Sequence, residues 1–148
     1  MLQILKIKDV KTPERSGRNA GFDFFVPNDF QPTTLLAWEN ITIPSGIKVR
    51  LPNDYVLIAF NKSGIAVKHK LHVGACVVDE NYTGEIHLDI HNLGGKRFYI
   101  EPGMKLMQFV LIKQQYHNIV EAMSEDELYA NFNKKERGRA CFGSTGIK

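Results

Sequence analysis

The chain has 148 residues, of which 43% are hydrophobic and 24% charged, a composition that suits one folded domain and excludes a disordered polymer. A formal net charge of +3 is too small to indicate nucleic-acid binding, although mild basicity suits a small polyanionic ligand. No apolar run approaches the roughly 20 residues of a membrane span. The chain has two cysteines, too few to predict a framework of disulfide bonds. We therefore expect a cytoplasmic protein, or one in the host cytoplasm if the source is viral, without membrane or nucleic acid as partner.

Short two-fold patterns run through most of the chain. Residues 1–8 mix apolar residues with lysine and read as a strand rather than a signal peptide. Residues 47–51 and 86–91 alternate apolar and polar side chains, whereas residues 55–60 and 106–112 are mostly continuous apolar runs. These patterns predict half-buried and fully buried strands, respectively.

Turn residues separate these runs. Proline, glycine, asparagine and aspartate cluster at residues 27–29, 44–46, 52–54, 92–95 and 102–103. Many short strands with closely spaced turns predict an all-β barrel or sandwich.

One short helix is predicted near the C-terminal end, because Ser124 and Glu127 form a capping-box pattern with Leu128 and Phe132 behind it. Residues 137–146 differ from the rest, with three glycines, two arginines and one aromatic side chain. Their composition permits either a frayed tail or an arm that orders on an anionic ligand.

Two segments carry residues suited to nucleotide chemistry. Residues 61–64 follow a strand with a Ser-Gly turn and Lys62 alongside, which predicts a phosphate nest, although the spaced glycines of a Walker loop are missing. Residues 77–84 predict a β-hairpin whose exposed main chain binds the edge of a flat base. Asp79 in this segment is a candidate general base, and capping of the turn is the alternative.

The histidines permit a second interpretation. His69 and His72 are three residues apart, and His87 and His91 are four apart, so a transition-metal site is conceivable. However, His87, Asp89 and His91 share one face of a predicted strand. A polar strand face or a subunit interface explains this pattern without metal.

Five segments in chain order resemble the five motifs of the trimeric dUTPase family. They are residues 20–24, residues 62–66, residues 74–84, Pro102-Gly103 with Gln108, and residues 137–146. The resemblance implies a distorted jelly-roll-like β-barrel that forms a homotrimer with shared active sites. It implies Mg²⁺-dependent hydrolysis of dUTP to dUMP and pyrophosphate, in a single domain over residues 1–148 whose last part, from about residue 137, is a mobile arm.

The resemblance also assigns roles around the base and sugar. Asp79 activates the water that attacks the α-phosphorus, and Tyr82 packs against deoxyribose and excludes a 2′-hydroxyl. Phe142 stacks on uracil, and Gly143 and Ser144 complete the lid. The uracil edge is read by main chain at four positions: Cys76, Val77, Val78 and His87.

The phosphates and the metal ion have their own set of residues. Asp23 holds Mg²⁺ through water, and Gln108 binds phosphate or the attacking water. Arg137 reaches the γ-phosphate. The remaining phosphate contacts come from three consecutive residues: Lys62, Ser63 and Gly64.

The sequence departs from the family pattern at several of these motifs. Lys62 stands where arginine is usual, Asn81 where a second carboxylate is common, and Cys76 where a glycine is common. Ala140-Cys141 replaces the usual paired glycines, so a stiffer arm is expected. A dCTP deaminase-like enzyme, which shares the fold, and a non-catalytic trimeric binding module are the competing hypotheses.

Overall fold

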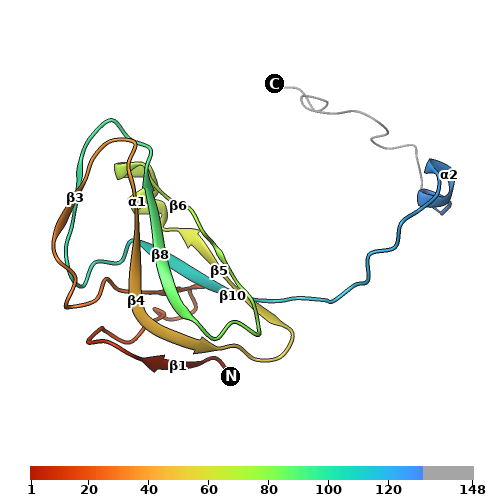
Figure 1. Ribbon diagram of the computed structural model, residues 1–148, viewed down its shortest axis with the longest axis horizontal. Coiled ribbons are helices and arrows are strands. Elements are labelled where there is room, and N and C mark those ends of the chain that lie inside the picture. The colour runs from red at the N-terminus through yellow and green to blue at the C-terminus, as the bar shows by residue number, and fades with distance from the viewer. Residues whose placement is uncertain (132–148) are drawn as a thin grey trace. The chain divides into compact units, whose positions relative to one another are not determined.

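The computed structural model describes residues 1–131 of the chain (Figure 1). Its contacts divide the chain into two units, residues 1–116 and the part from residue 117 onward. Within the described residues there are ten strands and two helices, and every strand pairing is antiparallel. The prediction of an all-β protein is therefore confirmed.

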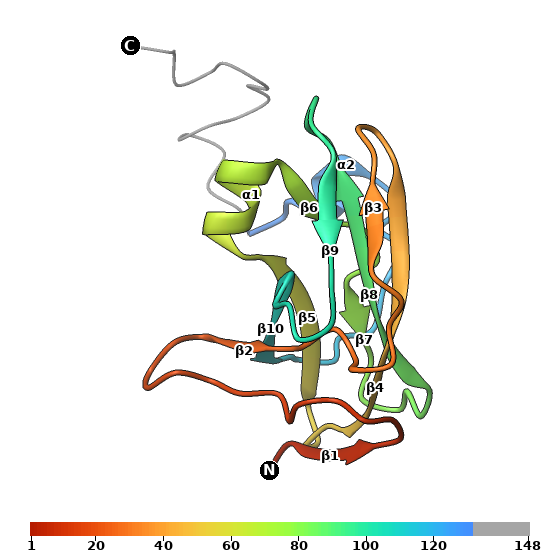
Figure 2. The same ribbon diagram turned by 90° about the vertical axis from the view of Figure 1, so that its left-hand side faces the viewer.

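The first unit contains two four-stranded sheets and one two-stranded sheet. One sheet has the order β1 (Gln3–Lys6), β4 (Asn40–Arg50), β8 (Glu85–Asn92) and β6 (Leu71–Val73). The other has the order β2 (Gly21–Asp23), β10 (Met107–Lys113), β5 (Tyr55–Asn61) and β7 (Val77–Val78). The two-stranded sheet pairs β3 (Thr33–Leu35) with β9 (Phe98–Ile100), which lie side by side in Figure 2.

A single apolar core receives side chains from both large sheets. Ile43 and Leu88 come from β4 and β8, whereas Leu57 and Phe109 come from β5 and β10, and all four are at most 2% exposed. The rings of Phe24 and Phe109 lie 4.5 Å apart between centroids. Burial of this apolar surface is the main force that holds the sheets together.

The predicted alternation of residues 86–91 is confirmed on β8. Ile86, Leu88 and Ile90 are at most 2% exposed, and His87 on the opposite face is exposed. The polar face is not uniformly solvated, however, because Asp89 is only 9% exposed. Its carboxylate therefore needs partners inside the protein.

The predicted turn at residues 44–46 is wrong, because strand β4 continues through it. The register of β4 against β8 shifts between Pro44 and Lys48, which marks an irregularity of the bulge kind. Gly46 supplies the required positive φ of 74°, and its N–H donates to Glu85 Oε1 at 2.7 Å. Turn residues inside a long strand thus produce a bulge when the strand keeps a partner on both sides.

The predicted β-hairpin of residues 77–84 is also wrong. β7 pairs with β5 in one sheet, whereas the following strand, β8, pairs with β4 and β6 in the other. The intervening residues are a tight turn that links two sheets. The local sequence predicts the turn correctly, but the sheet that each strand joins depends on its neighbouring strands.

Two short helices occur among the described residues, where the sequence predicted one. The predicted helix is α2 (Glu125–Leu128), whose N-cap Ser124 accepts a hydrogen bond at 3.1 Å from the N–H of Glu127. The other helix, α1 (Ser63–His69), starts after Lys62 without a side-chain cap, so the usual start signal is missing. Neither helix in residues 1–131 is long and apolar enough to cross a membrane.

Candidate functional site

One end of strand β5 carries a cluster of paired charges around Asp23. Asp23 Oδ1 accepts a hydrogen bond from Lys62 Nζ, and Asp23 Oδ2 lies 3.0 Å from Lys105 Nζ. Lys105 Nζ also lies 3.6 Å from Glu14 Oε1. Burial pushes the pKa of Asp23 upward, but the hydrogen bonds and charges of the two lysines outweigh it, so this pKa lies below its ordinary value. Asp23 is therefore a carboxylate near neutral pH.

Gln108 lies beside this cluster. Gln108 and Asp23 are register partners on β10 and β2, so their side chains leave the sheet on the same face. Gln108 Nε2 donates to the carbonyl oxygen of Asn61 at 3.0 Å. A Cβ atom on Gly21 would lie 2.3 Å from Gln108 Oε1, so the glycine makes room for this side chain.

Ser63 and Gly64 follow directly as the first residues of α1. The first N–H groups of a helix have no acceptor within the helix, which leaves those of Ser63 and Gly64 for another partner. Both residues are exposed, and the space at the missing Cβ of Gly64 is open. The structure thus brings Asp23, Lys62 and Gln108 together with the start of this helix.

The other end of β5 faces the turn that holds Asp79 and Tyr82. The N–H of Tyr82 donates to the carbonyl oxygen of Asp79 at 3.1 Å, which closes a β-turn. Tyr82 Oη donates to the carbonyl oxygen of Glu85 at 2.9 Å. A Cβ on Gly84 would lie 2.3 Å from that hydroxyl, so Gly84 lets the tyrosine ring fold back over the chain. Asp79 is exposed, and Tyr82 is 42% exposed.

Two open hollows flank this turn. One, of about 690 Å³, lies on the Asp79 side, and the other, of about 600 Å³, lies on the Tyr82 side. The first is lined by Asn53, Asp54, Asp79, Glu80, Asn81, Gln114 and Tyr116. The second is lined by residues 3–5 of β1, residues 48–50 of β4 and residues 80–83. Open space therefore borders this turn on both sides, and Asp79 faces the larger of the two hollows.

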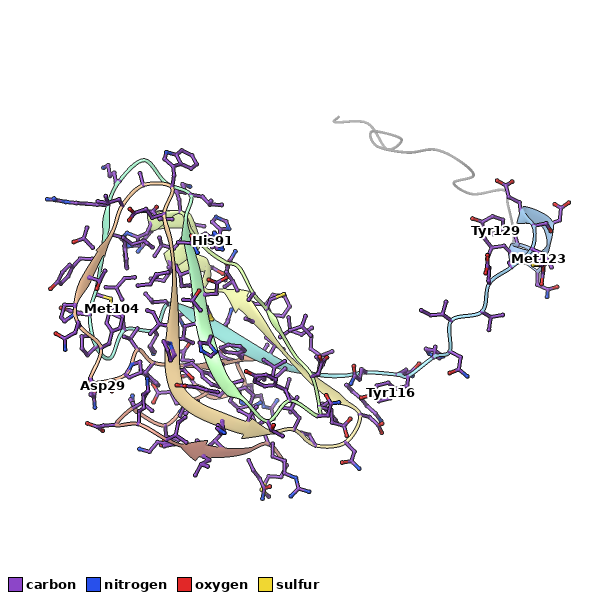
Figure 3. The ribbon with its side chains drawn as sticks, in the orientation of Figure 1. Asp29, His91, Met104, Tyr116, Met123 and Tyr129 are labelled. Atoms are coloured by element: carbon purple, nitrogen blue, oxygen red, sulfur yellow. The ribbon has the colours of Figure 1, made fainter. Side chains whose placement is uncertain are left out.

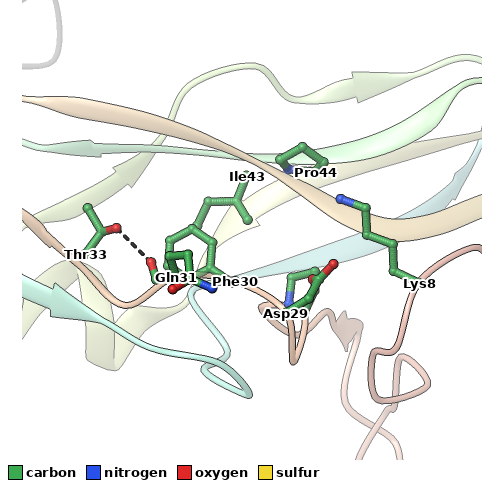
Figure 4. A pocket seen from close by; sticks show the side chains of 8 residues that line it. Lys8, Asp29, Phe30, Gln31, Thr33, Ile43 and Pro44 are labelled. Carbon is green, nitrogen blue, oxygen red and sulfur yellow. Dashed lines mark hydrogen bonds between the residues drawn. The ribbon is translucent and has the colours of Figure 1, made fainter.

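A third hollow, of about 320 Å³, contains none of the predicted site residues. Figure 4 shows it between the chain before β3 and strand β4, with Lys8 and Asp29 at one side. None of its lining residues belongs to either end of β5, so it is not part of the candidate site.

The predicted base-reading main chain lies on an edge strand. Among the described residues, β7 has β5 as its one neighbour in the sheet, through the pairs Val77–Ile58 and Val78–Leu57. The backbone on its other edge has no strand partner, which suits hydrogen bonding to a planar ligand. Just before the strand, Cys76 is an exposed free cysteine whose carbonyl oxygen accepts from the N–H of Ala59 at 2.8 Å.

The histidine side chains make separate polar contacts. His87 lies on β8, in the other sheet from β7, with Nδ1 3.0 Å from the carbonyl oxygen of Glu85. His91, labelled in Figure 3, has Nε2 3.5 Å from Asp89 Oδ2. In residues 1–131 no three His, Cys, Asp or Glu side chains lie close enough to hold a metal ion together.

The two groups of candidate residues are far apart within one chain. Val78 pairs with Leu57, which places Asp79 level with Val56, whereas Lys62 follows the opposite end of β5. At a rise of about 3.3 Å per residue, these ends are roughly 20 Å apart. A triphosphate is much shorter than this distance, so one chain does not bring Asp79 to the Lys62 end of β5.

Four predicted site residues lie outside the described part of the chain. They are Arg137, Phe142, Gly143 and Ser144. The expected start of the arm near residue 137 and the Ala140-Cys141 departure lie there too, so these remain predictions.

Sequence reasoning missed Lys105 and Glu14 as members of the charged cluster. Lys105 stands immediately before an apolar run, and Glu14 lies in an irregular segment, so neither position has a local signal. Glu14 reaches the cluster through an isolated β-bridge to Asp23, with backbone hydrogen bonds of 2.7 and 3.1 Å. Only these tertiary contacts could have identified them.

Known protein families provide the decisive comparison. The dUTPase family model matches residues 8–146, which is nearly the whole chain. The chain belongs to the dUTPase family. The resemblance inferred from the five motifs is thus confirmed.

Two curated dUTPase relatives illustrate the similarity. The deoxyuridine 5'-triphosphate nucleotidohydrolase of Rickettsia felis is 36% identical over 131 residues, which cover 87% of this chain and 83% of that protein. The enzyme of the same name from Mus musculus is 31% identical over 131 residues, which cover 88% of this chain and 75% of that protein.

Solved dUTPase structures share the fold. A dUTPase of Staphylococcus bacteriophage 80alpha, solved with dUPNHPP, has a TM-score of 0.83 and 22% identity, with 99% of each chain covered. A mutant dUTPase of phage phi11 of S. aureus, described with a structural Mg(II) ion, has a TM-score of 0.75 and 21% identity, and the match covers 85% of this chain and 99% of that chain. These similarities confirm the jelly-roll-like arrangement expected for the dUTPase family.

Proposed function

We propose that this protein hydrolyses dUTP to dUMP and pyrophosphate. Membership of the dUTPase family supports the reaction. The observation that carries the assignment to residues is the turn that joins Asp79 to Tyr82 directly after the edge strand β7. The carboxylate of Asp79, the ring of Tyr82 and the free edge of β7 therefore lie next to one another, where a nucleotide could contact all three.

In the proposed reaction, Asp79 accepts a proton from a water molecule as the water oxygen attacks the α-phosphorus. The bond between the α-phosphorus and its bridging oxygen to the β-phosphorus breaks, and that oxygen leaves with pyrophosphate. A positioned general base contributes about 10²–10⁴-fold to such a step. The exposed Asp79 borders a hollow of about 690 Å³, which leaves room for the water and the phosphate.

Sugar and base are recognised by the same turn and strand. Tyr82 is held by its hydrogen bond to Glu85, and we propose that its ring packs against deoxyribose and excludes a 2′-hydroxyl. The main chain of residues 76–78, together with His87, reads the uracil edge. Cytosine presents a donor where uracil presents an acceptor, so fixed main-chain groups are left unpaired with the wrong base.

The phosphates are bound by residues at the opposite end of β5. Lys62, Ser63, Gly64 and Gln108 lie together there and supply positive charge, N–H groups and an amide. Arg137 is proposed to reach the γ-phosphate. Phe142 stacks on uracil, with Gly143 and Ser144 completing the lid, so that water is excluded from the closed site.

Asp23 has the donor type that suits the proposed Mg²⁺ cofactor. Magnesium prefers hard oxygen ligands and usually keeps several waters. Because Lys62 and Lys105 contact both carboxylate oxygens of Asp23, a contact through water fits better than direct coordination. When bound, Mg²⁺ neutralises charge on the phosphates.

We propose a homotrimer, and the separation of the two residue groups suits active sites that are shared between its chains. Within one chain, Asp79 and the cluster around Asp23 are roughly 20 Å apart. Asp79 of one chain and the Asp23 cluster of a second chain would together form a complete site. We place the enzyme in the cytoplasm, or in the host cytoplasm if the source is viral. We also propose that residues 1–148 form a single domain whose last part, about residues 137–148, is a flexible arm.

A direct assay tests this function. The purified chain is incubated with Mg²⁺ and, in separate reactions, with dUTP, UTP and each other deoxynucleoside triphosphate. Pyrophosphate release specific to dUTP is expected. Ammonia release from dCTP would instead indicate a deaminase, and binding without turnover would indicate a non-catalytic module.

A further inference from the structure

Asp89 is a buried carboxylate that the proposed chemistry does not use. It lies in the middle of β8 and is only 9% exposed. Burial pushes its pKa upward, but hydrogen bonds from Ala75 and Thr42 and the nearby His91 outweigh burial and keep this pKa below its ordinary value. A charged group is therefore maintained inside the protein, where it needs hydrogen-bond donors.

The donors come largely from one segment, residues 74–76. Asp89 Oδ2 accepts from the N–H of Ala75 at 2.8 Å, and its main-chain oxygen accepts from the N–H of Gly74 at 3.1 Å. Its other carboxylate oxygen accepts from Thr42 Oγ1 at 2.8 Å. One residue of β8 thus binds two consecutive N–H groups of this segment.

The approach of the segment to Asp89 is unusually close. A Cβ atom on Gly74 would lie 2.0 Å from Asp89 Oδ2 and 2.3 Å from His91 Nε2, so a side chain at this position would collide with both. His91 is also the register partner of His72, whose Nδ1 lies 3.0 Å from Asn61 Nδ2. The segment therefore packs against a cluster of polar side chains.

This segment leads directly into the proposed base-reading strand. It connects β6 in one sheet to β7 in the other. On the first side Asp89 binds Gly74 and Ala75, and on the second side the carbonyl oxygen of Cys76 accepts from Ala59. The backbone is thus fixed on both sides immediately before Val77.

We propose that Asp89 is a positioning residue that sets base selectivity, by fixing the main chain of residues 74–76 and hence the groups of residues 76–78 that read uracil. This role rests on the proposed function. Main-chain donors and acceptors discriminate between bases only while they stay in place, and displacements below 1 Å weaken such recognition. Loss of the carboxylate therefore changes base binding more than the chemical step.

The test compares Asp89→Leu, Asp89→Ser and Asp89→Asn in the full chain with Mg²⁺. Leucine has no acceptor for the N–H of Ala75, and the hydroxyl of serine lies on a side chain too short to take the place of Asp89 Oδ2. Asparagine keeps one amide oxygen for Ala75, and its NH₂ group faces the hydroxyl of Thr42, which accepts as well as donates. The matched control is Glu39→Leu, which removes another carboxylate anchor, to the N–H of Leu36 at 2.8 Å, in a turn without proposed site residues.

The measurements are kcat and KM for dUTP and the ratio of kcat/KM for dUTP to that for dCTP. Asp89→Leu and Asp89→Ser are expected to raise KM about tenfold and to lower the ratio about tenfold, with kcat changed less than about threefold. Asp89→Asn and Glu39→Leu are expected to stay within about threefold of the unmodified chain.

The outcomes separate this role from the proposed function. If the unmodified chain releases no pyrophosphate from dUTP, the proposed function is wrong and this inference fails with it. If the unmodified chain is active but Asp89→Ser keeps both its KM and its base ratio, the positioning role alone is wrong. A folded Asp89→Ser is sufficient for this decision should Asp89→Leu fail to fold.

Discussion

The two ends of strand β5 differ in how their charges are satisfied. At the Asn61 end, Asp23 is paired with Lys62 and Lys105 within the same chain, and its pKa is lowered. At the Tyr55 end, Asp79 is exposed beside an open hollow. The proposed phosphate-binding end is therefore assembled within a single chain, whereas the proposed base at the other end is open to solvent.

This difference has a physical reason. Lysine and carboxylate side chains that pair in advance are held in place, so less conformational entropy is lost when a polyanion binds. A general base, in contrast, must reach water and keep its lone pairs available. Each end of β5 has the arrangement that its proposed role requires.

The largest expected effect comes from removing the base at the open end. Asp79→Asn is expected to lower kcat by about 10²–10⁴-fold while dUTP still binds, because the amide cannot accept the proton of water. Pyrophosphate release measures turnover, and calorimetry with a non-hydrolysable dUTP analogue measures binding. Asp54→Asn in the same hollow is the control, since asparagine tolerates the positive φ of 64° at this position. Full turnover by Asp79→Asn would exclude Asp79 as the base.

Removal of the arm tests whether the open end depends on a lid. Ending the chain before Arg137 is expected to lower kcat/KM by about 10²-fold, because alignment and water exclusion are lost. Circular dichroism and thermal unfolding check that the β fold remains. An unchanged rate in the shortened chain would remove the arm from the mechanism.

The paired end is tested by removing one of its cations. Lys62→Met is expected to raise KM for dUTP about tenfold, in keeping with the loss of one charge-assisted hydrogen bond. Lys68→Met, on the exposed last turn of α1, is the matched control and should leave KM unchanged. Equal KM values for both variants would show that the cluster around Asp23 is structural only.

Sugar selection at the open end is tested at Tyr82. Tyr82→Ala is expected to lower the preference for dUTP over UTP about tenfold, since the ring no longer fills the space of a 2′-hydroxyl. Tyr82→Phe keeps the ring and loses only the hydrogen bond to Glu85, so it should retain most of the preference. Competition assays with both nucleotides give the ratio directly, and equal ratios for alanine and phenylalanine would assign sugar selection to another group.

The smallest effect concerns acid stability. Because the folded-state pKa values of Asp23 and Asp89 are lowered, their contribution to stability is present above about pH 4 and is lost as the pH falls through those values. The urea midpoint is therefore expected to decline below pH 4, and less steeply for Asp89→Asn. Parallel declines for variant and unmodified chain would show that Asp89 adds nothing to this pH dependence.

The sequence alone determined the features that depend on neighbouring residues. Two-fold periodicity identified the strands at residues 47–51 and 86–91, and Ser124 marked the start of α2. The five short motifs in chain order, with Asp79 and Tyr82 in the third, were together sufficient to indicate the family. Each of these signals is local, because it arises from backbone geometry and side-chain chemistry within a few residues.

Tertiary structure decided everything that depends on residues distant in the chain. Residues 44–46 look like a turn, but β4 has strands on both sides and bulges instead. Residues 77–84 look like a hairpin, but β7 joins β5 in the other sheet. Lys105 and Asp89 obtain their ion pairs and hydrogen bonds from partners that no local pattern reveals. Pairing and burial are set by the whole packed core, so a short stretch of sequence constrains them only weakly.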